Sequence, residues 1–295
     1  MVNKIRIAPT PSGFLHLGNV LSFALTAALA QRVNASILLR IDDLDRQRAN
    51  PAYVQDVFDT LNFLEIPWHE GPRNMQDFES EWSQLHRMDL YQQALIQLQQ
   101  SRQVFACTCS RSQIRSLSAD ESYPGTCCMK VLPLTTDAAS WRLLTATGEP
   151  VLVNNWPVGI QSASLPAAIQ HFVVRKRDGY PAYQLSSLVD DLHFGITHIM
   201  RGADLWASTL AQFYLSGILK EDSFQQIKFH HHDLLLGDGH AKLSKSAGAT
   251  SIRYLREQGY KSADVYQQIA RQLGVGETIA DWQQLAEAYF GHRSF

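Results

Sequence analysis

The chain has 295 residues, of which 45% are hydrophobic, and its formal net charge at pH 7 is −2. This length and composition suffice for a sizeable core in one large domain or two. The near-neutral charge excludes a globally basic nucleic-acid binder, so any RNA surface must be a local patch. Neither a signal peptide nor an apolar run of about 20 residues is present, so we expect a cytoplasmic protein with no membrane partner.

The chain begins with a predicted strand, a rigid loop and a buried helix. Ile5–Ala8 is an apolar run, and two prolines and a glycine then interrupt regular structure. Asn19 is a suitable N-cap for a helix with apolar residues over Leu21–Ala30. A helix N-terminus has free N–H groups and about half a positive charge, which suits phosphate. His16 would lie close to that phosphate, and Gly18 would leave room for a ligand.

A second strand, Ser36–Ile41, completes a βαβ unit with parallel strands. Asp42, Asp43 and Asp45 follow it, at the edge where open α/β sheets bind ligands. These acids are either solvated or in contact with a ligand. We expect Asp42 at a substrate amine, and the other two bonded to the backbone or to arginine.

Two helices and a strand come next. Asn50 and Pro51 start one helix, with proline at its first position. A longer helix is predicted from about Ser80 to Leu98, followed by a strand at Gln103–Ala106.

All four cysteines lie in a short polar stretch after that strand: Cys107, Cys109, Cys127 and Cys128. In a reducing compartment such clustering favours a metal over disulfides, although reduced structural thiols remain an alternative. Three thiolates are part of a tetrahedral zinc site. The fourth ligand is Tyr123, Cys128 or a distant group.

The second half of the chain continues the α/β pattern. Leu132–Leu165 is predicted to be part of an inserted α+β subdomain. Further elements are a strand at His171–Arg175, a helix at Tyr183–Phe194 and a strand at Ile196–Met200. Arg201 follows that last strand, and its guanidinium suits a substrate carboxylate.

A helix at Ser208–Leu219 and a strand ending at His232 lead to a basic loop, Lys242–Ser246. Its two lysines can reach a triphosphate, although a solvated basic turn is the usual meaning of such a segment. The adjacent histidines alternate in direction, so we interpret them as satisfied side chains and not as metal ligands. Amphipathic helices are predicted at Tyr254–Gln258, Ala263–Leu273 and Trp282–Phe290.

Taken together, these stretches resemble class I aminoacyl-tRNA synthetases, whose paired signatures match His16–Asn19 and Lys242–Ser246. The glutamyl-tRNA synthetase branch is the most similar, through Arg6–Gly13, Arg40–Asp45 and Val189–Asp191. The resemblance implies an α/β fold: a Rossmann-type doubly wound parallel sheet, an inserted zinc-bearing α+β subdomain and a short C-terminal helical segment. The expected bounds are 1–105 with 172–240 for the catalytic domain, 106–171 for the insert and 241–295 for the remainder.

The resemblance also implies the site. His16 and Lys245 would be catalytic, stabilising charge on ATP. The implied ATP-binding residues are Pro9, His16, Gly18, Asn19, Lys242, Ser244 and Lys245, with Mg²⁺ accompanying ATP. The implied glutamate-binding residues are Arg6, Ile7, Ala8, Pro9, Thr10, Asp42, Tyr183 and Arg201. Two positions depart from the family, which usually has serine in place of Thr10 and glutamate in place of Asp42.

A short paralogue in this branch, glutamyl-queuosine tRNA(Asp) synthetase, has a zinc pattern that matches Cys107, Cys109, Tyr123 and Cys127. It ends near the same point and lacks an anticodon-binding domain. It transfers L-glutamate to queuosine in the anticodon of tRNA(Asp), which is the function we expect here. The alternatives are a truncated enzyme charging another acceptor, a small nucleotidyltransferase, and a non-catalytic tRNA-binding protein.

Overall fold

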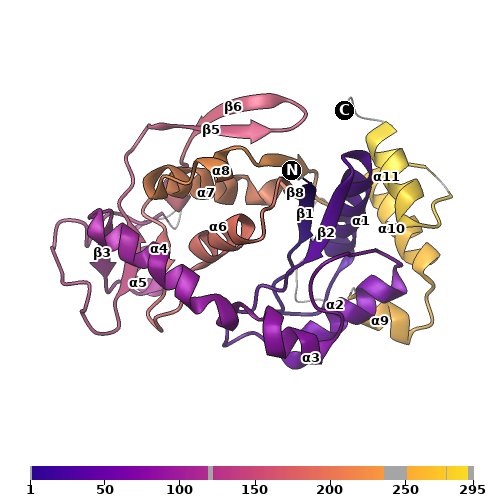
Figure 1. Ribbon diagram of the computed structural model, residues 1–295, viewed down its shortest axis with the longest axis horizontal. Coiled ribbons are helices and arrows are strands. Elements are labelled where there is room, and N and C mark those ends of the chain that lie inside the picture. The colour runs from indigo at the N-terminus through magenta and orange to yellow at the C-terminus, as the bar shows by residue number, and fades with distance from the viewer. Residues whose placement is uncertain (1, 119–121, 236–250, 277, 292–295) are drawn as a thin grey trace. The chain divides into compact units, whose positions relative to one another are not determined.

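The structure is a computed structural model that describes residues 2–118, 122–235, 251–276 and 278–291. The chain forms two compact units (Figure 1). Unit 1 comprises Met1–His86, Ile196–Ala203 and His230–Phe295, and unit 2 comprises Arg87–Gly195 and Asp204–Phe229. The domain bounds expected from the sequence stay a prediction.

Unit 1 is built on a parallel sheet, as predicted. Its strands are β1 (Asn3–Ile7), β2 (Ala35–Leu39), β8 (His198–Gly202) and the end of β9 (Lys228–His232), in the order β2-β1-β8-β9. β1 pairs in parallel with both β2 and β8. The carboxyl ends of β1, β2 and β8 therefore lie at one edge of unit 1.

Helix α1 (Leu17–Arg32) covers this sheet and is buried on most of its circumference. It contacts β1, β2 and β8, and it also contacts α10 (Ser262–Leu273) and α11 (Trp282–Gly291). Small residues such as Ala24 and Ala27 are fully buried and allow this close approach from two directions. An all-round apolar helix is typical of such a position.

The remaining helical elements of unit 1 lie near residue 60 and after residue 250. Asn50 caps α2 (Pro51–Phe63) with proline at the first turn, which confirms the prediction. Ser251 caps α9 (Ile252–Glu257), which contacts α2. A short helix, α3, spans Met75–Asp77.

The long helix expected from about Ser80 is wrong in its first part. A π-helical turn covers Phe78–Trp82, a 3-10 turn covers Gln84–Arg87, and only Met88–Gln100 forms an α-helix, α4. The break lies at Ser83, where the backbone turns to ψ 141°. There the Ser83 hydroxyl and the Gln84 N–H donate to Asp43, at 2.7 and 2.8 Å. These buried tertiary hydrogen bonds override local helical preference.

Unit 2 contains two β arrangements. β3 (Val104–Cys107), β4 (Ser140–Leu143) and β7 (Val173–Arg175) form an antiparallel sheet. β5 (Pro150–Asn155) and β6 (Gly159–Ser164) form a hairpin, which extends the start of β9 through the Asn155–Phe229 pair. The hairpin was not predicted, and it makes the sheet mixed. The helices of unit 2 are α4, α5 (Arg111–Leu117), α6 (Tyr183–His193), α7 (Trp206–Leu219) and α8 (Asp222–Gln225), with a 3-10 turn at Ala167–Ile169. A further 3-10 turn, Ala203–Leu205, lies where the chain passes from unit 1 to unit 2.

A buried carboxylate joins the helices of unit 2. Asp190 in α6 accepts hydrogen bonds from both Nε and Nη2 of Arg87, at 2.7 and 3.1 Å. It also accepts the hydroxyl of Tyr91 in α4 at 2.6 Å. These charge-assisted bonds fix α4 against α6.

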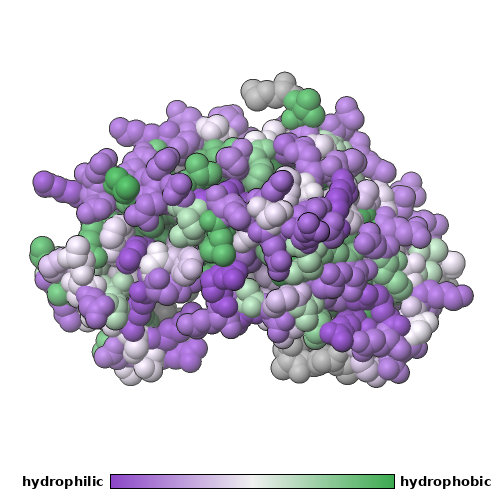
Figure 2. All heavy atoms as spheres, turned by 60° about the horizontal axis from the view of Figure 1, so that its bottom comes forward, coloured by the Kyte–Doolittle hydropathy of each residue, from purple (hydrophilic) through white to green (hydrophobic). Residues whose placement is uncertain are grey.

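The surface is mainly polar where it can be followed. On the face shown in Figure 2, hydrophilic side chains dominate and hydrophobic ones occur in small groups. Exposed apolar side chains include Leu152, Val158 and Ile160, on and beside the β5–β6 hairpin. Within the described parts of the chain, every helix is too short or too polar to cross a bilayer.

Candidate active site and cysteine cluster

The loop between β1 and α1 ends at His16, which is the N-cap of α1. The predicted N-cap at Asn19 is therefore wrong by three residues. His16 Nδ1 accepts the Gly18 N–H at 3.2 Å, and Asn19 Oδ1 accepts the His16 N–H at 3.1 Å. This reciprocal arrangement is a capping box, with His16 in place of the usual serine or threonine.

The cap determines the state of the imidazole. Because Nδ1 accepts a hydrogen bond, the neutral ring carries its proton on Nε2, which is then the donor toward an anion. The N–H groups of Gly18 and Asn19 bond to Nδ1 and to the carbonyl of His16, at 3.2 and 2.9 Å. In this conformation these two amides are engaged within the turn, so an anion at this position would be met by His16 Nε2 and the helix dipole.

The structure shows what lies beside Gly18 in the turn, while the prediction that it leaves room for a ligand stays a prediction. A Cβ placed at this residue would lie 3.1 Å from His16 Cε1 and 3.2 Å from Nδ1. The missing side chain thus makes room for the His16 ring in its capping position.

The three acids after β2 have distinct partners. Asp43 accepts the Gln84 N–H and an Arg46 guanidinium, and Asp45 pairs with Arg48 at 2.9 Å. Both arrangements confirm the expectation of backbone or arginine partners.

Asp42 pairs with Arg40, through Nε at 2.7 Å and Nη2 at 3.1 Å, and both side chains are buried. Its N–H donates to the Pro9 carbonyl at 2.9 Å, which joins the residues following β1 and β2. The contact of Asp42 with a substrate amine stays a prediction.

Most of the other candidate residues of unit 1 lie on or just after its parallel strands. Arg6 and Ile7 are in β1, with Ala8, Pro9 and Thr10 directly after it, and Arg201 is in β8. The side chains of Arg6 and Arg201 are both buried. This edge thus combines guanidinium and carboxylate groups, the pair of charges that an amino acid's own carboxylate and amine require.

His231 in β9 lies within electrostatic reach of Arg201. Burial first and the charge of Arg201 second lower the pKa of His231 to about 3. The imidazole is therefore neutral at pH 7, and the histidines of β9 join no metal-ligand cluster among the described residues.

The remaining candidates fall elsewhere. Tyr183 is the first residue of α6 in unit 2. Lys242, Ser244 and Lys245 lie outside the described residues. The chain resumes at Ser251, which forms an antiparallel bridge with His16. Ser251, the first described residue after the lysine loop, therefore lies beside His16.

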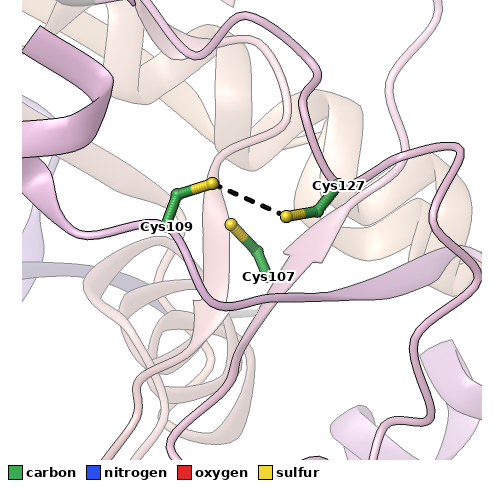
Figure 3. A group of neighbouring side chains, drawn as sticks. All are labelled: Cys107, Cys109 and Cys127. Atoms are coloured by element: carbon green, nitrogen blue, oxygen red, sulfur yellow. Dashed lines mark hydrogen bonds between the residues drawn. The ribbon is translucent and has the colours of Figure 1, made fainter. Parts of the chain in front are cut away.

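Three thiols converge in unit 2, as Figure 3 shows. The sulfur atoms of Cys107, Cys109 and Cys127 all lie within 4.8 Å of one another. Cys109 and Cys127 are 3.5 Å apart, which is too far for a disulfide. Tetrahedral zinc with Zn–S bonds of about 2.3 Å requires sulfur atoms about 3.8 Å apart, so the cluster fits a zinc ion.

Tyr123 lies at the same cluster. The Cys107 thiol donates to Tyr123 Oη at 3.5 Å, close to the separation of about 3.5 Å expected between oxygen and sulfur ligands of one zinc ion. The Cys127 N–H donates to the same oxygen at 2.8 Å. The Arg142 guanidinium lies 4.0 Å from the ring centroid. Cys128 stands apart from the triad, although its pKa is raised by burial and by the charges of Cys107 and Cys127.

The thiols differ in acidity. Burial opposes ionisation of Cys127, but hydrogen bonds from the Thr108 backbone, Cys109 and Tyr123 outweigh it and lower the pKa to about 7. Burial and the neighbouring Cys127 raise the pKa of Cys109 to about 11. Without a metal, Cys127 thus ionises more readily than Cys109, and a bound divalent cation would favour the thiolate form of both.

Some residues near His16 were missed from the sequence. Asp56 in α2 accepts the Leu15 N–H, and Arg256 in α9 pairs with Asp56. The available signal was an aspartate that directly precedes the apolar Val57 and Phe58 in α2, because a carboxylate close to the buried side of a helix requires a partner.

Comparison with known proteins identifies the family. Residues 2–130 and 139–288 match the catalytic domain of class I tRNA synthetases for E and Q. The chain belongs to this family. A glutamyl-Q tRNA(Asp) synthetase from Symbiobacterium thermophilum is 34% identical over 86% of this chain and 81% of its own length. A glutamate–tRNA ligase 2 from Nitrosococcus oceani is 32% identical over 91% of this chain, which spans 58% of that relative.

A solved structure agrees with the fold. Glutamate-tRNA synthetase from Elizabethkingia anophelis superposes with a TM-score of 0.77 at 22% identity, over 97% of this chain and 65% of that one. This likeness confirms the α/β class I synthetase fold expected from the sequence.

Proposed function

We propose that the chain activates L-glutamate with ATP and transfers it to queuosine in the anticodon of tRNA(Asp). The observation that carries this proposal is a group of four relatives named glutamyl-Q tRNA(Asp) synthetase. They are 31% to 34% identical over 84% to 92% of this chain. The buried charges in β1 and after β2 and the capped helix at His16 support it.

In the first step a glutamate carboxylate oxygen attacks the α-phosphorus of ATP. A bond to the pyrophosphate oxygen breaks, and pyrophosphate leaves with the electron pair. His16 Nε2 would donate to a phosphate oxygen, and Lys245 would offset the charge that develops on the leaving group. Mg²⁺, when bound with ATP, screens the phosphate charges.

Glutamate would be held through both of its ends. Arg6 and Arg201 supply guanidinium groups for carboxylates, and Asp42 supplies a carboxylate for the amine. Asp42 is one methylene shorter than the glutamate usual in the family, so it would reach the amine through water.

In the second step a queuosine hydroxyl oxygen attacks the acyl carbon of the adenylate. The acyl–phosphate C–O bond breaks, AMP leaves, and the hydroxyl proton passes to solvent. Zinc bound by Cys107, Cys109, Cys127 and Tyr123 would stabilise the fold of its own segment and takes no part in these steps.

The decisive experiment is amino-acid-dependent pyrophosphate exchange without tRNA. Exchange should occur with glutamate and ATP, and it should fall at least about 100-fold in His16→Ser. Serine is a good N-cap, so His16→Ser keeps the cap of α1 and separates the cap from the chemistry. Exchange with another amino acid but not with glutamate would refute the substrate.

The acceptor is tested with labelled glutamate and tRNA(Asp) with or without queuosine. Only the modified tRNA should become labelled. Equal labelling of both, or labelling of tRNA(Glu), would instead favour the glutamate–tRNA ligase activity named for the Nitrosococcus oceani relative.

A further inference from the structure

A buried carboxylate in α2 contacts the loop that carries His16. The Asp56 residue is 2% exposed. Its Oδ2 accepts the Leu15 N–H at 3.0 Å, and its Oδ1 accepts Arg256 Nη2 at 2.6 Å. The carboxylate therefore joins the residue before His16 to a cation 200 positions later in the sequence.

The same loop residue is held from its other side. The Leu15 carbonyl accepts the N–H of Ile252 at 2.8 Å, and Ile252 begins α9. Arg256 lies one helical turn further along α9. Leu15, Asp56 and α9 thus form a closed ring of contacts among three segments that are far apart in the sequence.

This ion pair is poorly explained by stability alone. Burying a carboxylate costs free energy that a partner repays only in part, and an apolar side chain of similar size is often as stable. The apolar Val54 and Phe58 lie two residues from Asp56 and so face another side of α2, whereas the buried Thr60, four residues on, shares the side of Asp56. What an apolar residue cannot provide is an acceptor for the Leu15 N–H.

We propose that Asp56 and Arg256 are positioning residues that set the backbone of Leu15 and thereby the place of the His16 imidazole. Neither residue touches substrate. The effect on catalysis rests on the proposed function, in which His16 stabilises the phosphates of ATP. The effect on the backbone of Leu15 does not depend on the proposed function.

The variants are Asp56→Asn, Arg256→Gln and Arg256→Lys. The first two should lower kcat for glutamate-dependent pyrophosphate exchange about 10- to 100-fold, because small displacements of a catalytic group have effects of this size. The KM for glutamate should change less than about twofold, since Arg6 and Asp42 are not moved. Arg256→Lys keeps a positive charge and should retain most of the wild-type kcat.

The matched control is Glu257→Gln on the same helix. Glu257 pairs with Arg253 at the surface, at 2.8 Å, so its loss should leave kcat unchanged. The second measurement is amide hydrogen exchange in peptides covering residues 13–19. Exchange should become faster in Asp56→Asn and Arg256→Gln, and it should stay unchanged in Glu257→Gln.

Unchanged kcat in both folded variants would overturn the proposal, as would an equal loss in the Glu257 control. If the wild-type chain shows no glutamate-dependent pyrophosphate exchange, the proposed function fails. Amide hydrogen exchange alone then tests whether Asp56 and Arg256 position the loop. Unchanged protection of residues 13–19 would then overturn it. Arg256→Gln serves both measurements if Asp56→Asn does not fold.

Discussion

At position 18 a side chain would crowd the imidazole of His16. Gly18→Ala places a Cβ 3.1 Å from His16 Cε1, so the ring must shift by a few tenths of an ångström within its capping position. We expect kcat for pyrophosphate exchange to fall about tenfold or more. Gly13→Ala is the matched control in the same loop, because a Cβ there meets no atom within 4 Å. Equal activity of the two variants would contradict this role of Gly18.

His231 makes stability depend on pH. Its pKa in the folded chain is about 3, below the ordinary value of 6.5. Between these two pH values the unfolded chain therefore binds more protons than the folded chain. Its contribution to stability is therefore complete above pH 6.5 and is lost as the pH falls toward 3. Between pH 7 and pH 5 the free energy of unfolding should fall by about 1–2 kcal/mol through this group.

Urea unfolding of the wild type and of His231→Gln at the two pH values measures this effect. The variant should show the smaller pH dependence. His86→Gln, at an exposed histidine, is the control and should behave like the wild type. A wild-type slope retained in His231→Gln would show that other groups carry the pH dependence.

At the scale of elements, the segment from β3 to Cys128 depends on its thiols. We expect about one equivalent of zinc in the purified chain. Cys109→Ser should lose it, because one of three converging sulfurs is removed, whereas Cys128→Ser should retain it. Metal analysis after gel filtration measures both.

Retention of a full equivalent of zinc in Cys109→Ser would rule out the proposed ligand set. Loss of zinc in Cys128→Ser, together with retention of zinc in Tyr123→Phe, would make Cys128 the fourth ligand.

Elements also show where sequence periodicity succeeds. The strands β1, β2 and β8 and the helices α1, α2, α6 and α7 were all predictable, because each has an apolar pattern of the right period. The region Phe78–Gln100 was not, because its apolar spacing suits one helix throughout. Only the hydrogen bonds from Ser83 and Gln84 to the distant Asp43 interrupt it.

At the scale of the whole molecule, the chain has two cores of different character. Unit 1 is a parallel sheet covered by the apolar α1, and unit 2 combines helices fixed through Asp190 with antiparallel strands. The candidate phosphate and amino-acid contacts lie mostly in unit 1, whereas Tyr183 and the cysteines lie in unit 2.

The sequence by itself determined the family, the parallel sheet, the position of His16 at a helix start and the cysteine cluster. These features depend on local patterns and on residues close together in the chain. Only the tertiary structure decided which group caps α1, why Gly18 lacks a side chain, and what holds Leu15. Those answers depend on contacts between residues far apart in the sequence, such as Asp56 and Arg256, which tertiary packing brings together. Local periodicity carries no information about such distant pairs.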